Sequence, residues 1–133
     1  MYIGSFGHDH LELKLKSTDI YIDIRDNFPT CTDKTSRYGI NKSIQKKYLK
    51  QEGVKALYKK EIYKKVVTKI NKRRHHNFRV FIGDSSGAKE SVILAERLER
   101  DLVKKLKIIS TIDHITLTAV SYTHLTLPTI LLV

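Results

Sequence analysis

Apolar and polar residues alternate in several short stretches of the chain, which is the pattern of half-buried β-strands. An apolar opening over residues 1–6 predicts a first strand, and residues 19–25 (DIYIDIR), with isoleucine at every second position, predict another. Residues 78–83 (FRVFIG) repeat the alternation, and residues 107–117 predict a last strand that carries His114. The chain therefore contains four expected strands.

Between these stretches the apolar spacing changes to three and four residues, which is typical of amphipathic helices. A helix is expected after Asn41, a good N-cap, with Ile40, Ile44 and Tyr48 on one face and Gly53 at its end. A second helix is expected over residues 54–70, where Tyr58, Ile62, Val66 and Ile70 recur at four-residue steps. These steps predict one buried face, with the lysines on the opposite side.

A long helix is expected to follow the third strand and to run to residue 106. Its apolar face is Val92, Ala95, Leu98, Leu102 and Leu106, and Ser91 or a neighbouring loop residue is expected to cap it. The order β-β-α-α-β-α-β predicts an α/β fold, with a small, largely parallel sheet and flanking helices in a single domain.

The turn between the third strand and the long helix is the first candidate site. A strand, a Gly/Ser loop and a helix N-terminus bring backbone N–H groups and hydroxyls to one point, which is how many α/β proteins hold an anion. The expected anion-binding residues are Gly83, Asp84, Ser85, Ser86, Gly87, Lys89 and Ser91, with Arg25 and His114 from neighbouring strands. The loop is no nucleoside-triphosphate P-loop, because Ala88 and Glu90 interrupt the Gly-Lys-Ser run. A simple turn without a ligand is the alternative.

A second candidate lies in the distribution of charge. The chain carries a net charge of +11, and the whole excess falls in residues 41–76, with 13 basic and 2 acidic residues. Such a block is typical of a contact with nucleic acid or another polyanion, although a solvated lysine-rich face is the alternative. The expected RNA-binding residues are Lys55, Lys59, Lys60, Lys64, Lys65, Lys69, Lys72, Arg73 and Arg74.

Other features narrow the class of protein. A single cysteine, Cys31, rules out an internal disulfide framework and suits a reducing compartment. No signal-peptide pattern and no membrane-spanning apolar run are visible, so a cytoplasmic protein is expected. His8 and His10 do not predict a metal site, because further ligands at recognisable spacing are missing. No cofactor is expected. Residues 27–39 form a loop long enough to be a lid or binding segment.

The placed elements show a resemblance to a known family. Ser5-Phe6-Gly7 follows the apolar residues that open the chain, and the second expected strand ends in Asp23-Ile24-Arg25. Residues 82–92 (IGDSSGAKESV) parallel the family pattern Ile-Gly-Cys-Thr-Gly-Gly-x-His-Arg-Ser-Val, and residues 95–98 (AERL) and 114–117 (HITL) parallel its later motifs. Over residues 1–117 the chain thus resembles the C-terminal domain of the RNase adapter protein RapZ and related stand-alone domains. The resemblance implies a regulator that binds RNA, presents it to an endoribonuclease, senses a phosphorylated amino sugar and assembles as a homo-oligomer.

The chain departs from the family pattern where ligand binding is most sensitive. Asp84, Lys89 and Glu90 stand where the family has Cys, His and Arg. Glu90 cannot hold phosphate oxygens as a guanidinium does, and Asp84 excludes cysteine-phosphatase chemistry. The expected function is therefore a non-enzymatic, RNA-binding adapter domain with a retuned or vestigial phosphosugar loop.

Two alternatives stay open. One is a small-molecule phosphate-binding or hydrolytic domain that uses Asp84, Ser85 and Lys89, with Arg25 and His8 converging on them. The other is a diverged mobile-element or phage protein that has kept only the fold.

The end of the chain is a separate matter. Residues 121–133 (SYTHLTLPTILLV) resemble the translation of a sequencing-adapter read. A domain over residues 1–117 and a non-native tail over residues 118–133 are therefore expected.

Overall fold

A computed structural model of the chain describes residues 1–75 and 77–116. The expected non-native tail, residues 118–133, lies outside the described residues. The described part forms one four-stranded sheet with the strand order β2-β3-β1-β4. The strands are β1 (Tyr2–Gly7), β2 (Ile20–Asp23), β3 (Arg79–Asp84) and β4 (Thr111–His114). All neighbouring strands are parallel, so the expected α/β class with flanking helices is confirmed.

Register places one apolar row of the sheet against the helices. Val80 of β3 pairs with Ile3 of β1 on one side and with Ile20 of β2 on the other. Ile82 of β3 pairs in the same way with Ser5 and Ile22. Ile3, Val80 and Ile82 have no exposed surface. They pack with the inner face of α4 (Glu90–Leu106), where Leu94, Leu98 and Leu102 are equally buried. The core therefore lies between the sheet and one helical layer.

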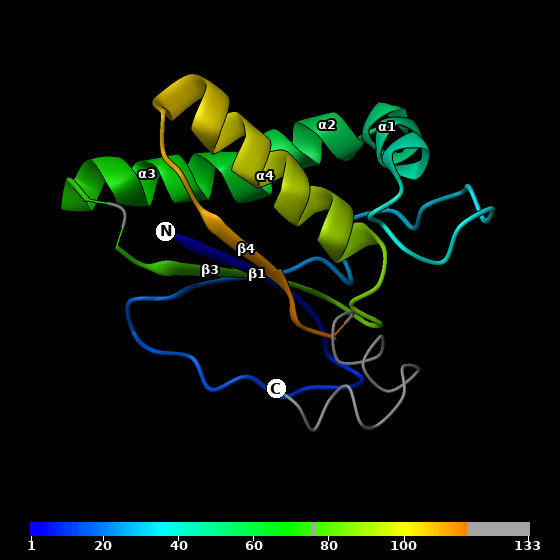
Figure 1. Cartoon of the computed structure of the whole chain (residues 1–133), viewed down its shortest axis with the longest axis horizontal. Helices are drawn as coiled ribbons and strands as arrows, with labels where there is room; N and C mark the ends of the chain where they lie inside the picture. The colour runs from blue at the N-terminus through cyan, green and yellow to red at the C-terminus, as the bar shows by residue number, and fades with distance from the viewer. Residues whose placement is uncertain (76, 117–133) are drawn as a thin grey trace, which may run out of the picture.

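The helices gather on one side of the sheet (Figure 1), and the segment that follows β1 runs along the other side. The first helix is α1 (Lys42–Lys50). Asn41 caps it as expected, because its side-chain oxygen accepts hydrogen bonds from the N–H groups of Ser43 and Ile44 at 3.0 and 3.2 Å. The expectation that Ile40 joins the buried face is wrong. Ile40 precedes the cap, and 52 % of it is exposed.

The second expected helix runs without a break from Val54 to Arg73. It comprises α2 (Val54–Leu57), a π-helical segment η1 (Tyr58–Tyr63) and α3 (Lys64–Arg73). Four residues turn an α-helix through about 400°, so a strict four-residue apolar stripe drifts by about 40° at each step. A π-helix turns less per residue. The π segment therefore keeps Val54, Tyr58, Ile62 and Val66, all buried, on one side.

The ends of two strands differ from expectation. The second strand was predicted to reach Arg25, but β2 ends at Asp23. The N–H of Ile24 donates the last hydrogen bond to β3, to the carbonyl of Gly83 at 3.0 Å. The last strand begins only at Thr111. Lys107 adopts a left-handed conformation with φ 58°, and Ile108 donates back to Leu102, so residues 107 and 108 complete the end of α4. Within the described residues no helix is both long and apolar enough to cross a membrane.

Candidate functional site

The carboxyl ends of the parallel strands meet at one edge of the sheet, where α/β proteins commonly bind ligands. The loop after β3, residues 85–89, is held there by two close backbone approaches. A Cβ at Gly7 would lie 2.3 Å from the Ser86 carbonyl oxygen, and a Cβ at Gly39 would lie 2.2 Å from that of Lys89. Gly87 adopts a positive φ of 73°. The loop is thus clamped between the end of β1 and the segment before α1.

The carboxylate of Asp84 occupies the position where this loop would bind an anion. One of its oxygens accepts a hydrogen bond from the N–H of Gly87, and the other accepts one from the N–H of Ser91 at 3.1 Å. Only 7 % of Asp84 is exposed. Burial raises the pKa of the Asp84 carboxyl, while the bonds from Ser91 and Gly87 oppose that rise. The N–H groups of Gly87 and Ser91 are therefore already engaged by a side chain of the protein.

The same carboxylate takes over the capping of α4. Ser91 itself does not cap this helix; of the two expected possibilities, Ser91 or a neighbouring loop residue, the second holds, because Asp84 of the predicted loop accepts the hydrogen bond. The N-cap residue, Lys89, makes no side-chain capping bond, and the Ser91 hydroxyl is buried with no hydrogen-bonding partner among the described residues. An acidic group at a helix N-terminus is favourable because it faces the positive end of the helix dipole. Asp84 supplies that group from the preceding strand.

The two other residues at the altered positions hold the long loop before α1. The Lys89 ammonium donates to the backbone carbonyl of Asp33. A Glu90 carboxylate oxygen accepts a hydrogen bond from the N–H of Cys31 at 3.2 Å. Both charged side chains are therefore used to fix residues 31–33 against the start of α4.

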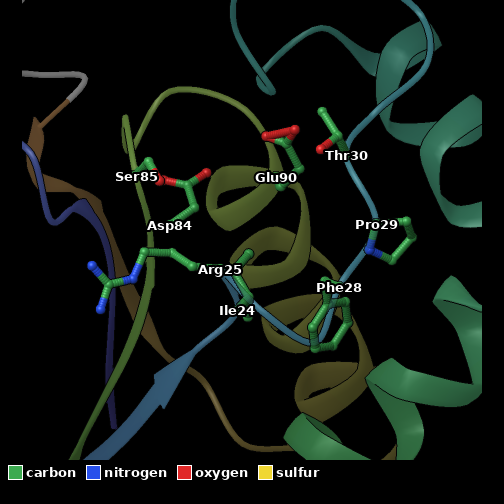
Figure 2. Close-up of a pocket in the computed structure, with 8 residues that line it drawn as sticks. All are labelled: Ile24, Arg25, Phe28, Pro29, Thr30, Asp84, Ser85 and Glu90. Carbon is green, nitrogen blue, oxygen red and sulfur yellow. The ribbon is translucent and has the colours of Figure 1, made fainter.

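A cavity of about 190 Å³ opens beside this loop (Figure 2). It is lined by Ile24, Arg25, Phe28, Pro29, Thr30, Asp84, Ser85 and Glu90. Figure 2 shows the Arg25 side chain extending away from Glu90 and Thr30. Its guanidinium makes a paired contact with the Asp23 carboxylate, at 2.7 Å for the shorter bond, and this contact lowers the pKa of Asp23 to about 2. With two carboxylates and an engaged guanidinium, the cavity disfavours phosphate.

Of the expected anion-binding residues, the structure brings only Arg25, Asp84 and Ser85 to this cavity. Gly83 lies in β3, where a Cβ would lie 2.5 Å from the His8 ring, and Ser86 is exposed and accepts a hydrogen bond from Ala88. His8 does not line the cavity. One of its ring nitrogens lies 2.9 Å from the Asp84 carbonyl oxygen, and its ring packs on Phe6. Of the residues named for the phosphate-binding or hydrolytic alternative, Arg25, Asp84 and Ser85 therefore line the cavity, whereas His8 and Lys89 do not.

His114 belongs to a partly buried network of polar contacts instead. Its Nδ1 lies 2.7 Å from the Ser5 hydroxyl and its Nε2 lies 3.2 Å from the Glu96 carboxylate, which Lys42 contacts at 3.0 Å. Burial raises the pKa of Glu96, but hydrogen bonds from His114 and Lys42 outweigh it and hold that pKa at about 2. Ser5, His114 and Glu96 are the residue types of a hydrolase triad. Ser5 has no exposed surface, however, and the contacts tie β1, β4, α4 and α1 together.

The expected RNA-binding residues lie along the outer side of the helix over residues 54–73, away from the loop after β3. All are exposed except Lys69. The Lys69 ammonium donates to the Thr18 carbonyl and lies 4.9 Å from the centre of the Phe78 ring. Lys65 pairs with Glu61 at 3.2 Å. Lys69 is therefore engaged in tertiary contacts, and the remaining residues form a basic outer face.

Sequence reasoning missed a second basic feature. A cavity of about 250 Å³ between α1, α2 and α4 is lined by Lys46, Leu49, Lys50, Lys55, Tyr58, Arg97 and Arg100. Only Lys55 belonged to the expected set. Lys46 and Lys50 are four residues apart on α1, and Arg97 and Arg100 are three apart on α4, so each pair shares a helix face. These spacings are the only sequence signal for the cavity, because Lys46 and Lys50 lie within the basic block of residues 41–76 and Arg97 and Arg100 lie outside it.

In the described part of the chain, no group of three or more His, Cys, Asp or Glu residues is placed to hold a metal ion. Comparison with known proteins supplies no relative: no family model matches the chain, and neither a curated protein nor a solved structure matches it significantly.

Proposed function

We propose that the protein binds structured RNA through a basic face and acts as a non-enzymatic adapter. The basic face is the exposed set Lys55, Lys59, Lys60, Lys64, Lys65, Lys72, Arg73 and Arg74. One observation carries the proposal: all eight cations lie on one continuous helical segment and its end. The buried stripe Val54, Tyr58, Ile62 and Val66 anchors that helix to the core. A helix of this length spans about 30 Å, which suits a contact with several successive phosphates.

The cations of this face are largely free to meet an external anion. Within residues 1–75 and 77–116, Lys65 is the only one of the eight with an ion pair, its partner being Glu61. Like charges one helical turn apart repel each other and weaken the helix slightly. Bound phosphates relieve that repulsion and release condensed counterions, so the affinity should fall steeply as salt rises.

The chemistry of the face predicts the kind of recognition. Lysine offers a flexible point charge and no fixed fork of donors, so it contacts phosphates more readily than it reads base edges. The face should therefore give affinity with little sequence preference. An adapter that delivers RNA to another protein needs no more than this.

The loop after β3 is, in this proposal, a vestigial anion site. The resemblance to the RapZ C-terminal domain family implies a pocket for a phosphorylated amino sugar. It also implies that the protein assembles as a homo-oligomer, and that assembly stays a prediction. Asp84 fills the place of the phosphate, and Lys89 and Glu90 hold neighbouring backbone. We therefore expect no phosphosugar binding by the wild-type loop.

The test is binding of the 133-residue chain to a structured RNA at about 50 mM and about 200 mM salt, where we expect a loss of at least about a hundredfold. A variant with Lys60, Lys64, Arg73 and Arg74 changed to Glu should lose binding. The matched control changes Lys14, Lys16, Lys34 and Arg37 to Glu, which are exposed basic residues elsewhere. Both variants have the same net charge. Equal loss in the two variants, or no binding by the wild type at low salt, would refute the proposal.

A further inference from the structure

The cavity between α1, α2 and α4 has a composition that sets it apart from the basic face. Five of its seven lining residues are cationic: Lys46, Lys50, Lys55, Arg97 and Arg100. Among the residues that the structure describes, no carboxylate lines it. The two remaining lining residues, Leu49 and Tyr58, contribute apolar surface. Five positive side chains around one small space repel each other, so the cavity as built favours a compact, highly charged anion.

Arg97 is held in a geometry that leaves its outer edge free. Its Nε donates to the Asp101 carboxylate at 3.1 Å, and the Tyr58 hydroxyl donates to the same carboxylate at 2.7 Å. Asp101 is buried, with 6 % exposed. The guanidinium lies 5.8 Å from the centre of the Tyr58 ring. Among the described residues, the terminal amino groups of Arg97 have no hydrogen-bonding partner. They are thus pre-oriented for two phosphate oxygens.

The size and charge of the cavity point to a class of ligand. Pockets for drug-sized molecules occupy about 300 to 1,000 Å³, so a cavity of about 250 Å³ suits a phosphate chain better than a whole nucleotide. An internal phosphodiester carries one negative charge, whereas a terminal phosphate carries about −1.5 to −2 at pH 7. A di- or triphosphate carries more. Five cations match such a group and exceed what one phosphodiester needs.

We propose that this cavity binds the 5′-di- or triphosphate end of an RNA chain. This rests on the proposed function, and it deepens it from general phosphate contact to recognition of an end. Lys55 belongs both to the cavity and to the basic face. An RNA strand whose 5′ end lies in the cavity can therefore continue along the outer side of the helix over residues 54–73. Free pyrophosphate has the same chemistry and is the competing source of the ligand.

The experiment compares two RNAs of one sequence, with a 5′-triphosphate or a 5′-hydroxyl end, in binding to the full chain at fixed salt. The wild type should prefer the triphosphate RNA by at least about tenfold, and pyrophosphate should compete for this preference. The double variant Lys50→Ala, Arg100→Ala removes two exposed cations of the cavity and should abolish the preference. The control variant, Lys60→Ala with Lys64→Ala, should bind both RNAs more weakly by the same factor. It should keep the preference for the triphosphate RNA.

Each contrary result has a distinct meaning. Equal binding of the two RNAs by the wild type would overturn the end-recognition inference while leaving RNA binding by the basic face intact. Binding of pyrophosphate alone, with neither RNA bound, would overturn the inference and the proposed function together, and would assign the cavity to a free polyphosphate. If the variant Lys50→Ala, Arg100→Ala still preferred the triphosphate RNA, the 5′ end would bind outside this cavity. That result would overturn the inference.

Discussion

The Asp84 carboxylate accepts a hydrogen bond from the backbone N–H of Ser91 at 3.1 Å, so the last residue of β3 caps the helix that follows it. The same carboxylate also binds the N–H of Gly87. An aspartate that replaces an external anion in this way makes the loop self-sufficient. Its side chain is thus the structural reason to expect that this loop binds no external anion.

Removal of this carboxylate should destabilise the protein and restore an anion site. Asp84→Ala leaves two buried N–H groups without their acceptor, which should cost about 1 to 3 kcal/mol of unfolding free energy. Added sulfate should recover part of that loss in the variant and little in the wild type, as measured by thermal unfolding against chloride at matched ionic strength. Asp26→Ala, at an exposed carboxylate, is the control. Equal sulfate responses in Asp84→Ala and the wild type would contradict the anion-mimic interpretation.

The polar network through Glu96 should make stability depend on pH. The pKa of the Glu96 carboxyl in the folded protein, about 2, lies below the usual value near 4.5. Folding therefore favours the ionised form of Glu96. That contribution is complete above about pH 5 and is lost as the pH falls towards 2; it is on the order of 3 kcal/mol. Urea unfolding of Glu96→Gln should show a shallower decline between pH 6 and about pH 3 than the wild type. A decline as steep as that of the wild type would assign the acid sensitivity to other carboxylates.

The Tyr58 hydroxyl should stabilise the folded protein through its hydrogen bond to Asp101, the residue that also holds Arg97 beside the cavity. Burial raises the pKa of Tyr58, so the phenol stays protonated and donates to Asp101. Tyr58→Phe removes a donor from a buried carboxylate and should cost about 1 to 3 kcal/mol in chemical unfolding. Tyr63→Phe, at the partly exposed end of η1, should cost much less. Similar costs for the two variants would show that the bond to Asp101 contributes little.

The close backbone approaches around the loop predict a contrast between two glycines. A Cβ at Gly7 would lie 2.3 Å from the Ser86 backbone, whereas at Gly53 no atom lies within 4 Å of the added carbon. Gly7→Ala should therefore cost about 3 kcal/mol or more, since backbone must move. Gly53→Ala meets only the strain of its positive φ and should cost about 1 kcal/mol. Denaturant midpoints of the two variants test this order, and a reversed order would refute the clamp around the loop.

Local periodicity was enough to predict most of the fold. Alternating isoleucines in residues 19–25 and the four-residue steps from Tyr58 to Ile70 each mark a buried face, because burial of apolar surface depends on the repeat of the element itself. Asn41 was likewise predictable, since an N-cap acts within its own turn. The strand order, the one-sided helical layer and the π segment are global packing outcomes that such local signals do not encode.

The candidate sites divide along the same line. The sequence determined that the lysines of residues 54–74 other than Lys69 face outwards, because the apolar stripe on the same helix excludes them from the core. Only the tertiary structure decided that Asp84 turns into its own loop, because that depends on how β3 meets the start of α4. Only packing of α1 against α4 brings Lys46 and Lys50 beside Arg97 and Arg100. Contacts between elements distant in the chain arise from which faces meet, and a one-dimensional pattern does not record that.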